Sequence, residues 1–356
     1  MRGPDERRFA QTSRLRQSST KDMRGAGRTD ELQQRIERDF DTETPPSTFE
    51  QSLDYVRDGF RQQARALQQL TGMNDRREQR QKALPLLARR KTVQDNLLVT
   101  MQKESITDTE RAQIVEFHDF ATGFLNFISR ELNVFYQQYG IQDKPGISVS
   151  SIVAAETQQQ LSELIITNAQ EASRHEEGLA RKRVFEDRVF NLLREMAIQA
   201  AGKTRGEHLY NTFINGAYGV AAAYLSYSNP SENKFGKSFK VIIPSPYLDA
   251  IEQTDLLLVD EGNMPREIHE EITHAIETLS EGGVHAVNNL SKEAKSYIYK
   301  VQVKLKYGSA EMTEEDMTNR DRFISARCKS LGFDNSDYLV LNYDRAKALI
   351  ERARKE

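Results

Sequence analysis

The last three residues of one short segment are typical of phosphate binding. Residues 197–204 end in Gly202, Lys203 and Thr204, which is how a P-loop ends. In a P-loop the main-chain amides surround the phosphates, the lysine contacts the β- and γ-phosphates, and the hydroxyl binds magnesium. This segment therefore predicts a site for ATP and magnesium.

A second segment carries the acids that such a site needs. Residues 256–259 are consecutive apolar residues, and Asp260 and Glu261 follow them directly. An apolar strand that ends in two acids can place one carboxylate on magnesium and the next on the attacking water. If the two segments meet, Glu261 is the catalytic residue of an ATPase. The residues that bind ATP and magnesium are then Gly202, Lys203, Thr204 and Asp260.

The first segment also has a simpler interpretation, as the end of a helix. Ala197 stands where a P-loop has glycine, and the apolar spacing before it is helical, whereas a P-loop follows a strand. In this interpretation Gly202 is the left-handed residue that terminates the helix. The ATPase hypothesis requires a strand at residues 192–197, and the simpler interpretation requires a helix there.

The histidines do not match a known metal-binding pattern. His269 and His274 lie five residues apart, whereas a zinc-binding helix places its histidines four apart so that both reach the metal. Five steps of about 100° put the two side chains roughly 140° apart around a helix. We therefore expect no metal ligands here, and no cofactor beyond the ATP and magnesium of the ATPase hypothesis.

Long amphipathic helices are expected to make up the first half of the chain. Apolar residues recur at intervals of three and four over residues 47–71, 107–139 and 151–201, which is the pattern of helices with one buried face. The stripe at 107–139 is the widest, so that helix should lie at the centre. We expect residues 47–201 to be a helical bundle domain.

The sequence also indicates where these helices begin. Ser47 and Glu50, and again Thr107 and Glu110, have the spacing of a capping box, in which each side chain bonds the other residue's main-chain amide. Between those two helices, Pro85 is expected to start another one, because proline is favoured in the first turn of a helix.

The composition changes at residue 202. Glycines and prolines become frequent and short β-type runs begin, so residues 202–356 are expected to form a smaller α/β domain. The expected strands are 238–243, 256–259, 284–287, 297–307 and 338–341. The expected helices are 266–280, 313–331 and 344–354.

Basic residues gather in two parts of the first half and on one predicted strand. Residues 1–46 have a basic, weakly hydrophobic start and are expected to be a disordered arm, and residues 76–91 are rich in arginine and lysine. On strand 297–307, Lys300, Lys304 and Lys306 share one face, which is expected to be exposed at the edge of a sheet. These regions could contact nucleic acid through its phosphates.

The overall composition limits the functional class. The net charge is −3 over 356 residues, which excludes a uniformly basic nucleic-acid binder. No apolar run approaches the roughly 18 residues of a membrane span. The single cysteine, Cys328, favours a reducing compartment, so a cytoplasmic location is expected.

These observations favour an interaction or scaffolding protein over an enzyme. The expected fold is mainly α, with a disordered basic arm, a helical bundle and a smaller α/β domain, and the expected partner is a protein bound through helical surfaces. The ATPase is the alternative, and a structural nucleic-acid binder ranks third. A homo-oligomer is compatible with each of the three.

Overall fold

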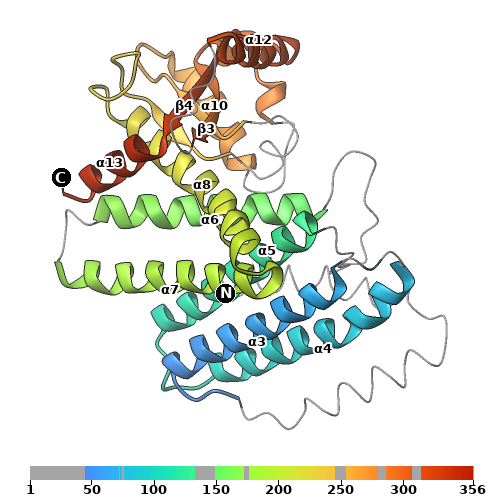
Figure 1. Ribbon diagram of the computed structural model, residues 1–356. Helices are drawn as coiled ribbons and strands as arrows, with labels where there is room; N and C mark the ends of the chain where they lie inside the picture. Colours follow the sequence, from blue (N-terminus) through green and yellow to red (C-terminus); the bar gives the residue numbers. More distant parts are fainter. Residues whose placement is uncertain are drawn as a thin grey trace. The chain divides into compact units, whose positions relative to one another are not determined.

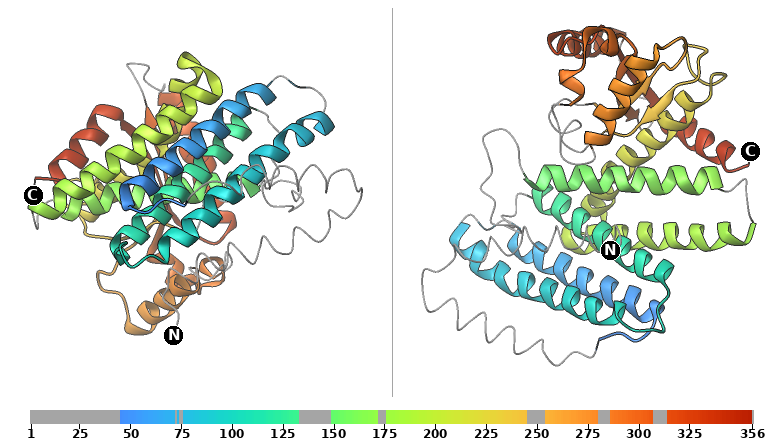
Figure 2. Two further views of the ribbon diagram at one scale, coloured as in Figure 1. Left: turned by 90° about the horizontal axis from the view of Figure 1, so that it is seen from below. Right: turned by 180° about the vertical axis from the view of Figure 1, so that it is seen from behind.

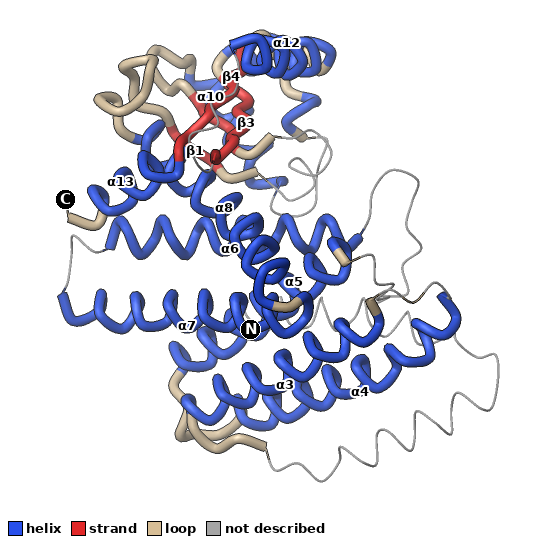
Figure 3. Tube along the Cα trace, in the orientation of Figure 1, coloured by secondary structure: helices blue, strands red, loops and turns tan. Residues whose placement is uncertain are grey.

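The computed structural model describes residues 45–71, 73, 76–132, 149–171, 176–244, 254–279, 286–306 and 314–355. This part is mostly helical with a small sheet towards the C-terminus (Figure 3), which confirms the predicted fold class. The arm predicted for residues 1–46, apart from its last two residues, lies outside the described residues, and so do residues 133–139, the end of the predicted helix 107–139.

The chain divides into two compact units, and each combines separate stretches of sequence. Unit 1 comprises Met1–Ala154 and Arg188–Tyr210, and unit 2 comprises Ala155–Asp187 and Asn211–Glu356. The sequence places a single boundary near residue 202, whereas these units divide the chain inside three long helices. Those helices are α6 (Val149–Glu171), α7 (Glu176–Ala201) and α8 (Lys203–Ser228).

In unit 1, three helices follow one another along the chain (Figure 1). They are α3 (Phe49–Leu70), α4 (Arg76–Met101) and α5 (Asp108–Glu131), and α3 packs against both of the others. In α5 every residue from 120 to 129 is buried, as expected of a helix that is apolar on most sides. The wide apolar stripe predicted for this helix is thus buried, and its central place in the bundle stays a prediction.

The predicted capping box is found at α5, whereas α3 has a side-chain cap at a neighbouring residue. At α5 the Thr107 hydroxyl accepts a bond from the Glu110 amide (3.3 Å), and the Glu110 carboxylate accepts one from the Thr107 amide (2.9 Å), as predicted. At α3 the cap is Thr48, which accepts from the Gln51 amide at 3.3 Å. The pairing predicted for Ser47 with its third neighbour is therefore wrong by one residue.

The shift leaves the first acid of α3 available for another contact. The Gln51 side chain accepts the Ser47 amide (3.0 Å) in the place predicted for Glu50. Glu50 instead pairs with Arg188 of α7 at 2.8 Å. Thr48 and Gln51 have the same three-residue spacing as the predicted pair, and the sequence alone did not distinguish the two.

Two other helices begin or run differently from prediction. Pro85 lies inside α4, nine residues after its first residue, Arg76. It therefore does not start that helix, although an internal proline costs one main-chain hydrogen bond.

Helix α8 was not predicted at all, because its glycines suggested loops. The added Cβ of an alanine at Gly206 would lie 2.6 Å from the Ala197 carbonyl oxygen, and one at Gly219 would lie 3.3 Å from the Leu305 Cβ. These glycines permit close packing inside a helix.

Unit 2 contains the sheet, whose strands are β1 (Lys240–Ile242), β2 (Leu256–Val259), β3 (Ile298–Lys306) and β4 (Asn335–Asn342). They are arranged in the order β1-β2-β3-β4, with β2 antiparallel to both neighbours and β4 parallel to β3. The predicted strand 284–287 is not confirmed, because Val287 begins the short 3₁₀ helix η1 (Val287–Asn289) and residues 284 and 285 lie outside the described residues.

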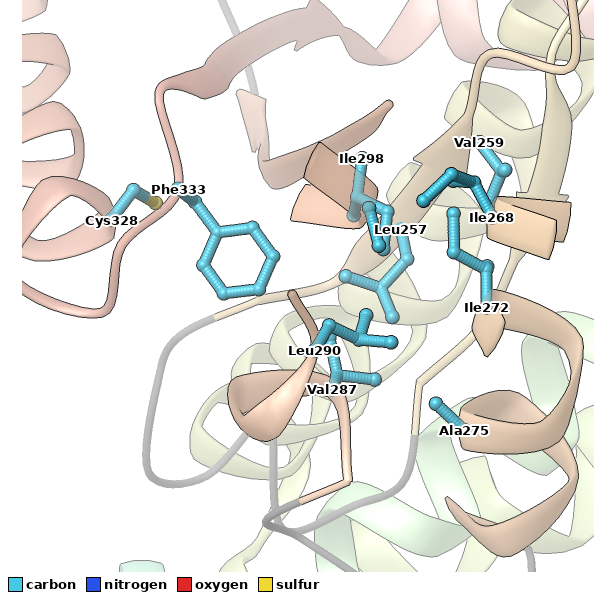
Figure 4. Packing of buried hydrophobic residues seen from close by; sticks show 11 residues of the cluster. Leu257, Val259, Ile268, Ile272, Ala275, Val287, Leu290, Ile298, Cys328 and Phe333 are labelled. Carbon is cyan, nitrogen blue, oxygen red and sulfur yellow. The ribbon is translucent and has the colours of Figure 1, made fainter. Parts of the chain in front are cut away.

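Helices cover both faces of this sheet. On one face, Leu257 and Ile298 pack with α10 (Arg266–Leu279), η1, α11 (Lys292–Ser296) and the end of α12 (Glu314–Ser330), as Figure 4 shows. We call this the α10 face. On the opposite face, Gly219 of α8 approaches Leu305 of β3, and α13 (Tyr343–Ala353) contacts β3 and β4. We call this the α8 face (Figure 2). A search of the described helices for a membrane-crossing segment finds no candidate.

Candidate functional site

The Gly202 segment is a junction between two helices. α7 is helical through Ala201, and α8 begins at Lys203. Gly202 has a φ of +75°, and its amide donates to the Ile198 carbonyl (2.9 Å), so it terminates α7 as a left-handed residue. Residues 192–197 are therefore helix, and the strand that a P-loop requires is not found there.

The two predicted acids lie just after β2, and each faces a cation. Asp260 accepts bonds from the Lys237 ammonium (2.7 Å) and the Gly262 amide (3.1 Å). The hydrogen bond to Asp260 raises the pKa of the Lys237 ammonium above its usual value. Glu261 lies 3.6 Å from the His269 ring and 4.0 Å from the Lys240 ammonium. A magnesium ion at Asp260 would have to displace Lys237.

The sheet around these acids differs from that of a P-loop ATPase. The acid-bearing strand β2 pairs antiparallel with both β1 and β3, whereas nucleotide-binding α/β sheets are mostly parallel. Lys203 and Thr204 belong to unit 1, and Asp260 and Glu261 belong to unit 2. No observation on the sheet favours the ATPase hypothesis.

The predicted lysine face of β3 is buried where β3 crosses the sheet. Lys300 is 1% exposed, because β3 is an inner strand and not an edge. Its ammonium lies 4.2 Å from the centre of the Phe333 ring and donates to the Asn288 side chain (3.2 Å). Lys304, near the end of the strand, is exposed. The expectation of an exposed basic face is thus wrong at Lys300, and the side chain of Lys306 lies outside the description.

The basic stretch 76–91 forms part of α4, but all of its arginine side chains lie outside the described part. Lys82 is exposed and pairs with Glu78 at 2.8 Å, one helical turn away. His269 and His274 are both exposed on α10. Within the described ranges, no group of three or more potential metal ligands comes together.

A buried polar group that the sequence did not reveal lies on the α8 face. Asp337 of β4 is 3% exposed. Its carboxylate accepts a 2.5 Å hydrogen bond from the Tyr227 hydroxyl of α8 and forms an ion pair with Lys234 in the loop after α8. Burial, and then the neighbouring carboxylate, raise the pKa of the Tyr227 phenol far above its usual value. The phenol is therefore a proton donor here and cannot act as a base near neutral pH.

Aromatic side chains pack around Tyr227. Phe235, Phe239 and Tyr299 contact one another with ring centres 5.3 to 5.5 Å apart, and Tyr227 lies 6.4 Å from the first two. The contacts of Asp337 with Tyr227 and Lys234 connect the loop after α8 to the sheet.

The sequence carries little sign of this group. The predicted strand at 338–341 begins one residue after Asp337, and a single acid beside a predicted strand is too weak a signal to identify a buried polar group.

The clearest exposed apolar residues in unit 1 lie on one helix. Leu98 is 38% exposed and Val99 is 48% exposed, while Val93 and Leu97 of the same helix are buried. With Lys91 and Asp95, which are exposed beside them, Leu98 and Val99 form what we call the outer face of α4.

Comparison of the chain with protein-family models, with curated proteins and with solved structures finds no match.

Proposed function

We propose that this chain is a protein–protein interaction or scaffolding module that acts through helical surfaces. The observation that supports it is the pair of exposed apolar side chains, Leu98 and Val99, on the outer face of α4. The predicted magnesium ligand Asp260 and the predicted catalytic residue Glu261 already face lysines of the chain itself, Lys237 and Lys240, which favours binding over catalysis. With a single cysteine, Cys328, which is buried, the module would work in the cytoplasm.

The geometry of α4 explains how such a surface would bind. Val93 and Leu97 are buried on the inner side of the helix, which packs against α3, so the outer face is held on a fixed support. Leu98 and Val99 are exposed, as are Lys91 and Asp95 before them on the helix. A partner with an apolar helix face would remove them from water and leave Lys91 and Asp95 at the rim, as in the apolar centre and polar rim of known interfaces.

Site-specific photo-crosslinking tests the proposal in cells. A photoreactive phenylalanine analogue at Val99 should capture a partner protein that the same analogue at Gln62, an exposed polar position of α3, does not. The captured protein is then purified, and its affinity is measured for the natural chain and for the L98S/V99S double variant. We expect the variant to bind about tenfold more weakly, because two partly exposed aliphatic side chains are lost from the interface.

Two outcomes would contradict this function. One is the same set of crosslinks from positions 62 and 99. The other is an affinity for the captured protein that does not change in the L98S/V99S variant while that variant keeps its helical circular dichroism and its unfolding midpoint.

A further inference from the structure

The direction of the main-chain groups in β4 follows from the bonds of β3. On the β2 side, the carbonyl oxygens of Tyr297 and Val301 accept hydrogen bonds from Asp260 and Asp255. Main-chain groups alternate in direction along a strand, so the even-numbered residues of β3 direct theirs to β4. In a parallel ladder, the Cα partners of those residues direct their own groups away. These outward residues of β4 are Ser336, Tyr338 and Val340.

β4 is an edge of the sheet, and its surroundings leave it partly exposed. The inner strand β2 is buried at each position, whereas Ser336, Leu339 and Val340 of β4 are half-buried. No other described residue makes a hydrogen bond to the main-chain groups of Ser336 or Val340. Helices α12 and α13 contact β4, and they do so without completing its ladder.

This edge lacks several of the features that normally prevent pairing, and the one that it has is an inward-pointing charge, Asp337. Protected edges carry lysine, proline or a bulge, or are very short. β4 is eight residues long, and its sequence Asn-Ser-Asp-Tyr-Leu-Val-Leu-Asn contains none of these. Its one charge, Asp337, is buried against Tyr227 and Lys234, so two copies of the strand would not repel each other.

We propose that β4 pairs antiparallel with β4 of a second copy of this chain, so that the two sheets become continuous. Identical antiparallel strands are self-complementary about a two-fold axis. With the axis at Tyr338, Ser336 of each copy faces Val340 of the other, and residues that face each other in this way exchange two main-chain hydrogen bonds. The centre of the strand is neutral and apolar, so the same strand of a second copy can lie against it without charge repulsion.

Proline at an outward position tests this pairing without breaking the β3 ladder. Val340→Pro removes an outward N–H that β3 does not use, a placement that edge strands tolerate. Val340→Thr is the matched control, since it keeps both the N–H and a β-branched side chain. By sedimentation velocity over a range of concentrations, the natural chain and V340T should dimerise with similar affinity. V340P should dimerise about 10- to 100-fold more weakly, because the symmetric interface loses this hydrogen bond twice.

A second pair of variants covers the case in which V340P does not fold. Ser336→Pro removes the other outward N–H in the same way, and Ser336→Thr is its control. A natural chain that stays monomeric up to high micromolar concentration would overturn the proposal and point to a strand from a different protein. Dimerisation that is unchanged in a folded V340P or S336P would equally overturn it.

Discussion

Tyr227 and Asp337 are separated by 110 positions in the sequence and joined by a 2.5 Å hydrogen bond in the interior of unit 2. Removing the hydroxyl in Tyr227→Phe leaves a buried carboxylate oxygen without this donor. We expect the free energy of unfolding to fall by about 1–3 kcal/mol. Urea unfolding measures it, with Tyr224→Phe, a half-exposed tyrosine of the same helix, as the control. Equal losses in both variants would contradict the assignment.

The same tyrosine predicts how stability depends on pH at alkaline values. The pKa of Tyr227 is raised above its usual value of 10.0 in the folded chain. Its contribution to stability is therefore fully present below pH 10 and is lost as the pH rises above it, because only the unfolded chain releases the phenolic proton readily. Between pH 9.5 and pH 11, Tyr227→Phe should lose stability less steeply than the natural chain. Parallel curves for the two proteins would argue against a buried phenol.

The capping box of α5 predicts an effect at acidic pH. Hydrogen bonds from the Thr107 amide and then from its hydroxyl lower the pKa of Glu110 below its usual value of 4.5. Its contribution is thus present above that value and is lost as the pH falls through the lowered pKa. Thr107→Ala should cost about 1 kcal/mol at pH 7 and less at pH 3. Thr109 is exposed in the first turn of α5, two residues after Thr107. Thr109→Ala should show neither effect in thermal unfolding.

Two glycines near the helix junction predict different costs for the same substitution. At Gly206 an added Cβ would lie 2.6 Å from the main chain of Ala197, so Gly206→Ala should destabilise unit 1 by several kcal/mol, on the order of 3. At Gly202 the Cβ would meet open space but the φ is +75°, so Gly202→Ala should cost only about 1 kcal/mol. Chemical unfolding followed by circular dichroism ranks the two. The reverse order would contradict the packing of α8 against α7.

Titration with a fluorescent ATP analogue and magnesium tests the remaining alternative function. Because Gly202 joins two helices and Asp260 pairs with Lys237, we expect no saturable binding, and no difference between the natural chain and Lys203→Ala. Saturable binding that is lost in Lys203→Ala would restore the ATPase hypothesis and make Glu261→Gln the next variant to measure.

The buried lysine predicts a measurable coupling with its aromatic neighbour. The Lys300 ammonium lies 4.2 Å from the centre of the Phe333 ring. Phe333→Leu should therefore cost more in the natural chain than in a Lys300→Met background, by about 1 kcal/mol. A double-mutant cycle of urea unfolding gives this difference. A coupling near zero would mean that the ring serves only as apolar filling.

The elements with a regular pattern were predictable, and those that depend on a distant contact were not. β2 was found because four apolar residues in a row fit a strand that is covered on both sides. α8 was missed because the need for glycine at 206 and 219 comes from Ala197 and Leu305, which a local pattern does not contain. A periodicity reports which residues share a face, but not what covers that face.

The candidate sites show the same limit. Alternation correctly placed Lys300 and Lys304 on one face of β3, but the burial of Lys300 depends on α10, α11 and Phe333 on that face. Asp260 and Glu261 were correctly placed at the end of a strand, and the lysines that they face were not foreseen. Asp337 could be recognised only once Tyr227 and Lys234 had been brought to it by the fold.

The division of the two units inside α6, α7 and α8 has a consequence for synthesis on the ribosome. The chain passes from unit 1 to unit 2 after Ala154, returns after Asp187 and leaves again after Tyr210. Unit 1 thus lacks part of its structure until residue 210 has emerged, and residues 155–187 must wait for residues that are made later still. Neither unit is thus one continuous stretch of the chain, and no single cleavage would yield either one whole.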